Sequence, residues 1–173
     1  MTDEEFRQAV LDLFPKLKVL AMAKTKNGAL AEDIVQDVMV KVWSAPAQIL
    51  QAVDGLETSL ESLERYLKRM VVNRFYDVVR REGKLEHDND FADQLLEVVP
   101  SEPTRRNLLF RDLARHLAEI GDDCRSLLVE RASGFTQQEL AEQRAISQSA
   151  VNKRIAKCLK ALSESCDGSL HDA

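Results

Sequence analysis

Residues 135–162 read FTQQELAEQRAISQSAVNKRIAKCLKAL, and this stretch decides the fold. Thr136, followed three residues later by Glu139, has the pattern of a capping box and predicts the start of a helix. Arg144-Ala145-Ile146 leaves room for a tight turn, and Ser147 is a suitable N-cap for a second helix. The stretch therefore predicts a helix-turn-helix, in which a short turn joins two helices that meet at a sharp angle.

The second of these helices, over 148–162, has an apolar face and a cationic face at 100° per residue. That division suits a helix that packs on one side and enters a DNA major groove on the other. The candidates for base contacts near its N-terminus are Gln148, Ser149, Asn152 and Lys153, and those for phosphate contacts are Arg154, Lys157 and Lys160. The plainer interpretation is a solvated lysine face on an ordinary amphipathic helix.

The composition of the whole chain agrees with helices. Its 173 residues are 45% apolar, 31% charged and 5% aromatic, with 6 Gly and 4 Pro. Few aromatic and turn-forming residues argue against β-sandwiches and barrels. We therefore expect an all-α protein with a hydrophobic core.

Targeting signals and cysteine motifs are not apparent. The N-terminus is acidic, and no 18 apolar residues run together, so we expect a cytoplasmic protein without membrane insertion. The cysteines Cys124, Cys158 and Cys166 contain no C-x-x-C pair, which predicts reduced thiols rather than disulfides or a zinc site. We expect Cys158 to be a buried structural thiol, and we expect no metal and no cofactor.

The chain divides into two helical blocks. Residues 1–83 predict three or four helices, in which Leu30, Ile34, Val38 and Val42 form one apolar stripe. Pro46 ends that helix, and residues 44–62 form a weakly patterned connection. Residues 84–107 are polar and acidic and predict a mobile linker with at most a helical turn or two, followed by a second helical domain over 108–162. We expect the tail, 163–173, to be frayed.

A second basic helix lies over 63–81. Six Lys and Arg residues and one acid fall between 65 and 81, although the net charge of the chain is −5. The exposed arc combines cationic, polar and aromatic side chains: Arg65, Tyr66, Arg69, Asn73, Tyr76, Asp77 and Arg80. Such a mixture favours single-stranded nucleic acid, because rings stack on unpaired bases while arginines follow the backbone. The alternative is that the tyrosines flank the core and the arginines form surface ion pairs.

Taken together, these motifs resemble the bacterial sigma factors of the extracytoplasmic-function (ECF) kind, which retain regions 2 and 4. Residues 31–43 resemble the helix that docks on core RNA polymerase, which implies core-binding roles for Asp33, Gln36 and Asp37. Residues 67–81 resemble the helix that recognises and melts the −10 promoter element, and residues 134–162 resemble the helix-turn-helix that reads the −35 element. At the turn, where the family usually has Leu-Gly, this chain has Arg144-Ala145.

The resemblance implies a promoter-specificity subunit whose partners are core polymerase, promoter DNA and an anti-sigma factor. An enzyme is not indicated, because the three histidines lie in separate parts of the chain and no Gly-rich phosphate loop occurs. Two other classes stay open from the residues alone. One is a helix-turn-helix regulator of another class, and the other is a helical adaptor that binds a protein through its basic faces.

Overall fold

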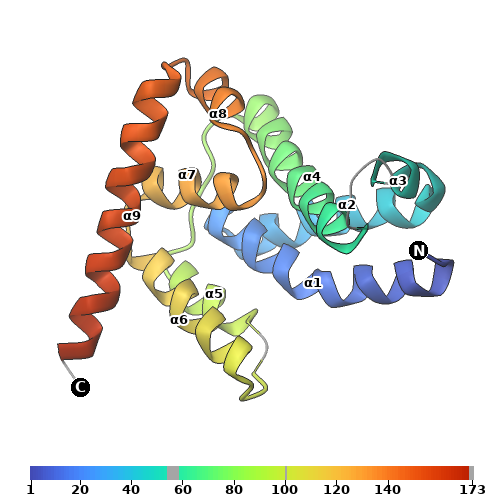
Figure 1. Cartoon of the computed structure of the whole chain (residues 1–173), viewed down its shortest axis with the longest axis horizontal. Coiled ribbons are helices and arrows are strands. Elements are labelled where there is room, and N and C mark those ends of the chain that lie inside the picture. Colours follow the sequence, from blue (N-terminus) through green and yellow to red (C-terminus); the bar gives the residue numbers. More distant parts are fainter. Residues whose placement is uncertain (54–58, 100, 172–173) are drawn as a thin grey trace. The chain divides into compact units, whose positions relative to one another are not determined.

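The computed structural model describes residues 1–53, 59–99 and 101–171, and within these ranges it contains nine α-helices and no strand (Figure 1). The all-α prediction is confirmed. The chain divides into two compact units, Met1–Phe91 and Ala92–Ala173. Within the described ranges no helix is both long enough and apolar enough to cross a membrane.

The first unit is built from α1 (Asp3–Thr25), α2 (Gly28–Ser44), α3 (Pro46–Val53) and α4 (Ser59–Glu82). α1, α2 and α4 pack against one another, and α3 packs against α2 and α4. Pro46 ends α2 as expected and opens α3, so part of the weakly patterned connection is helical; residues 54–58 lie outside the described ranges. The core is aliphatic and includes Val10, Leu17, Ile34, Val42, Leu67 and Val71.

The beginning of the expected linker is attached to the first unit. Asp88 donates its backbone N–H to the carbonyl of Lys26 at 2.7 Å, and its carboxylate accepts from the N–H of Gly28 at 2.9 Å. The side chain of Asn27, which also caps α2, donates to the carbonyl of Glu86 at 3.1 Å. Local hydrogen bonds therefore attach residues 86–88 of the expected linker to the α1–α2 junction. The linker also contains a short helix, α5 (Phe91–Glu97).

The second unit contains α6 (Arg105–Glu119), α7 (Asp122–Ala132), α8 (Gln137–Arg144) and α9 (Gln148–His171). α9 packs against α6, α7 and α8. α6 begins three residues earlier than predicted, because Thr104 provides an N-cap that accepts from the N–H of Asn107.

α9 continues to His171 instead of ending near residue 162, so the expected frayed tail is wrong up to that residue. The hydroxyl of Ser165 donates to Glu119 at 2.9 Å and lies 2.9 Å from Nδ1 of His116. Both partners are on α6, and these bonds hold the extension against the unit.

The cysteine prediction is also corrected. Cys124 on α7 and Cys158 on α9 form a disulfide with a Cα–Cα distance of 5.2 Å, so neither is a reduced thiol. Cys158 is buried as expected, with 4% of its surface exposed. The two positions are 34 residues apart in sequence, and the packing of α7 against α9 brings them together. No short motif marks such a pair.

Candidate nucleic-acid interface

The candidate DNA-facing residues of the first unit form one stripe along α4. They recur every three or four residues, a spacing that places side chains on a single helix face. Asn73, Asp77 and Arg80 are exposed, and Tyr66, Arg69 and Tyr76 are half-buried. The opposite face of α4 carries the buried residues Leu63, Leu67, Val71 and Val78. α4 is therefore amphipathic, and its core face fixes the direction of the polar stripe.

Tyr76 is more enclosed than its place on the predicted arc suggests. Nζ of Lys24, at the end of α1, lies 4.9 Å from the centre of the Tyr76 ring and 4.8 Å from that of Phe75. The same nitrogen is 3.5 Å from the Tyr76 hydroxyl, and Lys24 is only 7% exposed. A buried ammonium group over two aromatic rings is a cation–π arrangement. Both tyrosines on the expected exposed arc are half-buried, and Lys24 of α1 lies against Tyr76, which agrees in part with the alternative that the tyrosines flank the core.

Lys24 was not a candidate from the sequence. The only local sign in the sequence is that Lys24 directly follows the apolar run Val19–Ala23. In the structure, every residue from Val19 to Thr25 is buried. Only the packing of α1 against α4 shows which rings Lys24 meets.

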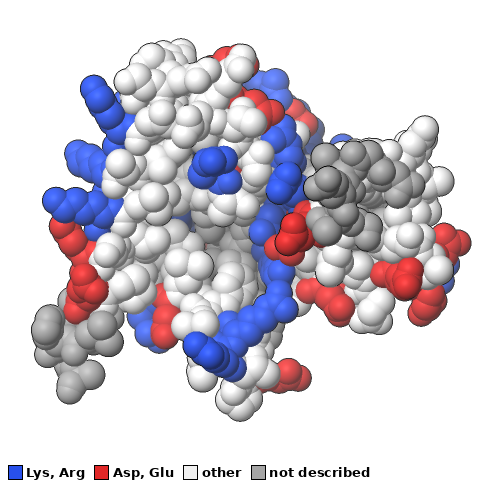
Figure 2. Space-filling view, viewed as in Figure 1, with Lys and Arg blue, Asp and Glu red and all other residues white. Residues whose placement is uncertain are grey.

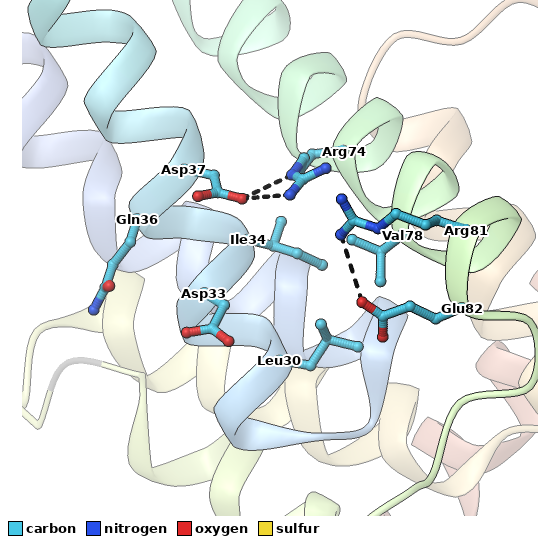
Figure 3. A pocket seen from close by; sticks show the side chains of 9 residues that line it. All are labelled: Leu30, Asp33, Ile34, Gln36, Asp37, Arg74, Val78, Arg81 and Glu82. Atoms are coloured by element: carbon cyan, nitrogen blue, oxygen red, sulfur yellow. Dashed lines mark hydrogen bonds and ion pairs between the residues drawn. The ribbon is translucent and has the colours of Figure 1, made fainter.

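A shallow pocket lies between α2 and α4 and contains the three candidate core-binding residues (Figure 3). Its apolar floor is Leu30, Ile34 and Val78, and its polar rim is Asp33, Gln36, Asp37, Arg74, Arg81 and Glu82. The structure therefore brings the three candidates together at a rim shared with arginines of α4.

The acids of this rim differ in their surroundings. Oδ2 of Asp37 accepts from Nε of Arg74 at 2.8 Å and lies 2.7 Å from its Nη2, so Asp37 holds α2 against α4 (Figure 3). Asp33 and Gln36 are exposed. Arg74 was not a candidate from the sequence, although it belongs to the basic run. Because Asp37 is paired with Arg74, the exposed residues Asp33 and Gln36 are better probes of an external partner than Asp37.

In the second unit the predicted helix-turn-helix is confirmed. Thr136 and Glu139 form the capping box: the N–H of Thr136 donates to Glu139 at 2.8 Å, and the N–H of Glu139 donates to Thr136 at 3.2 Å. The hydroxyl of Ser147 accepts from the N–H of Ala150 at 3.1 Å and caps α9. Ala145 ends α8 in the left-handed conformation, with φ 52° and ψ 44°.

A buried ion pair supports the turn. Oε2 of Glu130 on α7, which is fully buried, lies 2.7 Å from Nη2 of Arg144, the last residue of α8. A carboxylate in such a place requires a charged partner, since burial of an isolated charge is very unfavourable. Arg144 replaces the usual family residue at the turn, and its partner Glu130 explains the replacement. The sequence did not identify this pair because Glu130 lies 14 residues earlier, in another helix.

The polar face of α9 is open to solvent. Six candidates for DNA contacts on this face are exposed: Gln148, Ser149, Asn152, Lys153, Arg154 and Lys157. Figure 2 shows cationic side chains projecting along the first part of α9 and acidic ones nearer its C-terminus. Gln148 also lines a hollow with Arg131, Thr136, Gln137 and Gln138, so the start of α9 lies beside the start of α8.

Comparison with known proteins identifies the first unit. The family model for sigma-70 region 2 matches residues 10–85, which span the α2 pocket and the α4 stripe. Residues 10–85 therefore match a sigma-70 region 2 domain. The matched range contains both segments of the first unit whose motifs resemble a sigma factor, residues 31–43 and 67–81.

A likeness to a solved structure extends over both units of the chain. A chain in the co-crystal structure of the sigma factor RpoE in complex with the anti-sigma factor NepR from Bartonella quintana matches with a TM-score of 0.53 and 22% sequence identity. The match covers 95% of this chain and 98% of that chain. At 22% identity, this likeness shows that the two chains share a fold. A comparison with curated proteins gives no match.

Proposed function

We propose that this chain is an RNA polymerase sigma factor of the ECF kind. It binds core RNA polymerase through the α2 face, recognises and melts the −10 element with α4, and reads the −35 element with α8 and α9. The observation that carries the proposal is the α4 stripe. Five side chains able to stack on bases or contact phosphates lie with Asp77 on one face of a helix inside the region-2 match: Tyr66, Arg69, Asn73, Tyr76 and Arg80. Recognition and strand opening belong to the sigma factor in this proposal, and the polymerase supplies the catalysis.

The partners follow from the same assignment. Core polymerase and promoter DNA are the partners of a sigma factor, and the RpoE structure, with its bound anti-sigma factor, suggests an anti-sigma factor as a third. These interactions place the protein in the cytoplasm, where transcription takes place.

Run-off transcription with purified core polymerase on a genomic promoter library tests the proposal. We expect defined transcripts that require this chain, and the mapped start sites give both promoter elements. Absence of chain-dependent transcripts, together with no co-purification with core polymerase, would favour the regulator or the adaptor instead.

The docking face can be tested at one position. Asp33→Lys reverses an exposed charge on the pocket rim without breaking the Asp37–Arg74 pair, so the fold should be retained. We expect this variant to lose co-purification with core polymerase, because charge complementarity guides such association. Glu32→Lys, an exposed acid on the same helix outside the pocket lining, is the matched control. Equal binding by the Asp33 variant, the control and the parent would remove Asp33 from the interface.

A further inference from the structure

The disulfide between Cys124 and Cys158 encloses the DNA-reading motif of the second unit. The covalent loop runs from the first turn of α7, through all of α8 and its turn, to the middle of α9. It therefore contains the capping box, the left-handed Ala145 and all the candidate base contacts. Cys124 and Cys158 do not contribute to the capping box, the turn or the exposed face of α9, so the bond requires a separate explanation.

The two sulfur positions differ in access. Cys124 is half-buried near the surface end of α7, whereas Cys158 is 4% exposed on the packed side of α9. A small oxidant therefore reaches Cys124 first, and Cys158 is positioned to react with it from inside. Disulfides in cytoplasmic proteins are usually transient or redox-sensing, because the compartment keeps thiols reduced. A partly accessible bond is also more easily reduced than a buried one.

We infer that Cys124 and Cys158 form a reversible thiol–disulfide switch, oxidised by low-molecular-weight disulfides, that sets how firmly the helix-turn-helix is held. In the first step the Cys124 thiolate attacks one sulfur of glutathione disulfide, forms a mixed disulfide and releases one glutathione thiolate. In the second step the Cys158 thiolate attacks the Cys124 sulfur and releases the other. Two cysteines are oxidised, one glutathione disulfide is reduced to two thiols, and the two cysteine protons pass to the released thiolates.

The bond acts by restricting the unfolded chain. Closing a loop of this length removes conformational freedom from the opened state, so the oxidised unit opens less often than the reduced unit. The effect is local, because the loop lies within the second unit. Helices of the first unit therefore serve as an internal reference in the same molecule.

The test uses the full chain equilibrated in glutathione buffers from reducing to oxidising. Alkylation and mass spectrometry should show Cys124 and Cys158 losing reactivity together at one midpoint and regaining it when the buffer is reversed. Cys166→Ser, on the same helix but outside the bond, is the matched control and should behave as the parent. Cys124→Ser should abolish the transition.

Hydrogen exchange measured on the same samples tests the consequence. Amides of α7, α8 and the enclosed part of α9 should exchange about 100-fold more slowly after oxidation, whereas those of α1, α2 and α4 should not change. This comparison uses one unmodified chain in two states, so it does not depend on the folding of any variant. Three results would overturn the switch. The Cys124–Cys158 disulfide never forms, it stays oxidised in the most reducing buffer, or its formation leaves the hydrogen exchange of α8 unchanged.

Discussion

Ala145 is the residue at which the local sequence and the required backbone disagree most. It ends α8 with φ 52°, a conformation that glycine adopts without a Cβ penalty and that other residues adopt at a cost of about 1 to 2 kcal/mol. Its N–H still bonds to the carbonyls of Ala141 and Glu142, and the neighbouring Arg144 is paired with buried Glu130. These contacts hold the turn despite the missing glycine.

Ala145→Gly should therefore stabilise the second unit. We expect the free energy of unfolding to rise by about 1 kcal/mol, since relief of the left-handed strain exceeds the greater entropy of glycine in the unfolded chain. Thermal and denaturant unfolding measure the change. Ala156→Gly, at an exposed interior position of α9, is the matched control and should lower stability by about 1 kcal/mol. A decrease for Ala145→Gly as large as that of the control would show that the turn is not strained.

At this scale, sequence reasoning succeeded where the signal is local. The caps at Thr136 and Ser147 bond to residues three positions away, so the sequence identifies them. It failed where the partner is distant. Lys24 against Tyr76, Glu130 against Arg144 and Cys124 against Cys158 each join two helices, and no periodicity or short motif identifies such pairs.

Among the elements, α4 is both part of the core and the proposed melting surface. Its tyrosines differ in a way that the sequence did not indicate, because Tyr76 is held by Lys24 from α1. Among the residues that the structure describes, no lysine of α1 lies over the Tyr66 ring, so Tyr66 is the cleaner probe of base stacking. The helix ends of α4 and α9 also differ from prediction, since the boundaries depend on neighbouring elements.

Tyr66→Ala should impair open-complex formation far more than binding to closed duplex. Stacking on an unpaired base contributes about 1 to 3 kcal/mol, so we expect roughly a tenfold loss or more. Permanganate footprinting of the holoenzyme reports opening, and retardation of closed duplex reports binding. Tyr66→Phe keeps the ring and should behave as the parent. Tyr76→Ala should show a similar loss of opening together with lower stability. If both alanine variants open the promoter normally, the tyrosines have no part in strand opening.

α1 and α4 are also joined by a charged cluster whose pH dependence can be predicted. Glu64 on α4 lies 2.9 Å from Nζ of Lys16 on α1 and 2.8 Å from Nζ of Lys68. Burial alone raises the pKa of the Glu64 carboxyl group, but the hydrogen bonds from Lys68 and Lys16 outweigh burial and lower it. Because the folded pKa lies below the unfolded value of about 4.3, the stabilisation is present above that pH. It is lost as the pH falls through the folded pKa.

Glu64→Gln should therefore lower the free energy of unfolding at pH 7 by about 1 kcal/mol. The difference from the parent should shrink as the pH falls from about 5 towards 3, since the parent then loses the same interaction. Denaturant unfolding of parent and variant between about pH 3 and pH 7 measures this difference in the free energy of unfolding. Glu32→Gln, an exposed acid of α2, controls for the loss of one negative charge. A parent–variant difference that stays constant with pH would contradict the assignment.

For the whole molecule, charge is separated between helices rather than balanced along the chain. The net charge is −5, yet α4 and α9 each carry a cationic face. Composition and periodicity predicted the all-α class and both of these helices. They could not predict that 86–88 attach to the first unit or that α9 continues past residue 162, because both features depend on contacts with residues distant in sequence.

The two units are proposed to divide the promoter between them, and α9 can be tested within the complete complex. The net charge of −5 opposes binding of the isolated chain to DNA, so useful affinity for promoter DNA should appear in the holoenzyme. Within that complex the exposed residues Lys153 and Lys157 should differ. Lys153 lies nearer the N-terminus of α9, where a recognition helix contacts base edges, and Lys157 lies one turn further along.

Lys153→Ala should change sequence preference at one base pair of the upstream element by about 1 to 3 kcal/mol. Lys157→Ala should weaken all promoters alike and reduce the salt dependence of binding by roughly one unit in the slope of log affinity against log salt, because one phosphate contact is lost. Both variants are measured in holoenzyme against a randomised upstream element at two salt concentrations, and each is the control for the other. An unchanged sequence preference in the Lys153 variant would contradict a base contact at Lys153. An unchanged salt slope in the Lys157 variant would contradict a phosphate contact at Lys157. Because each variant removes one positive charge, a difference between them must come from their positions along α9.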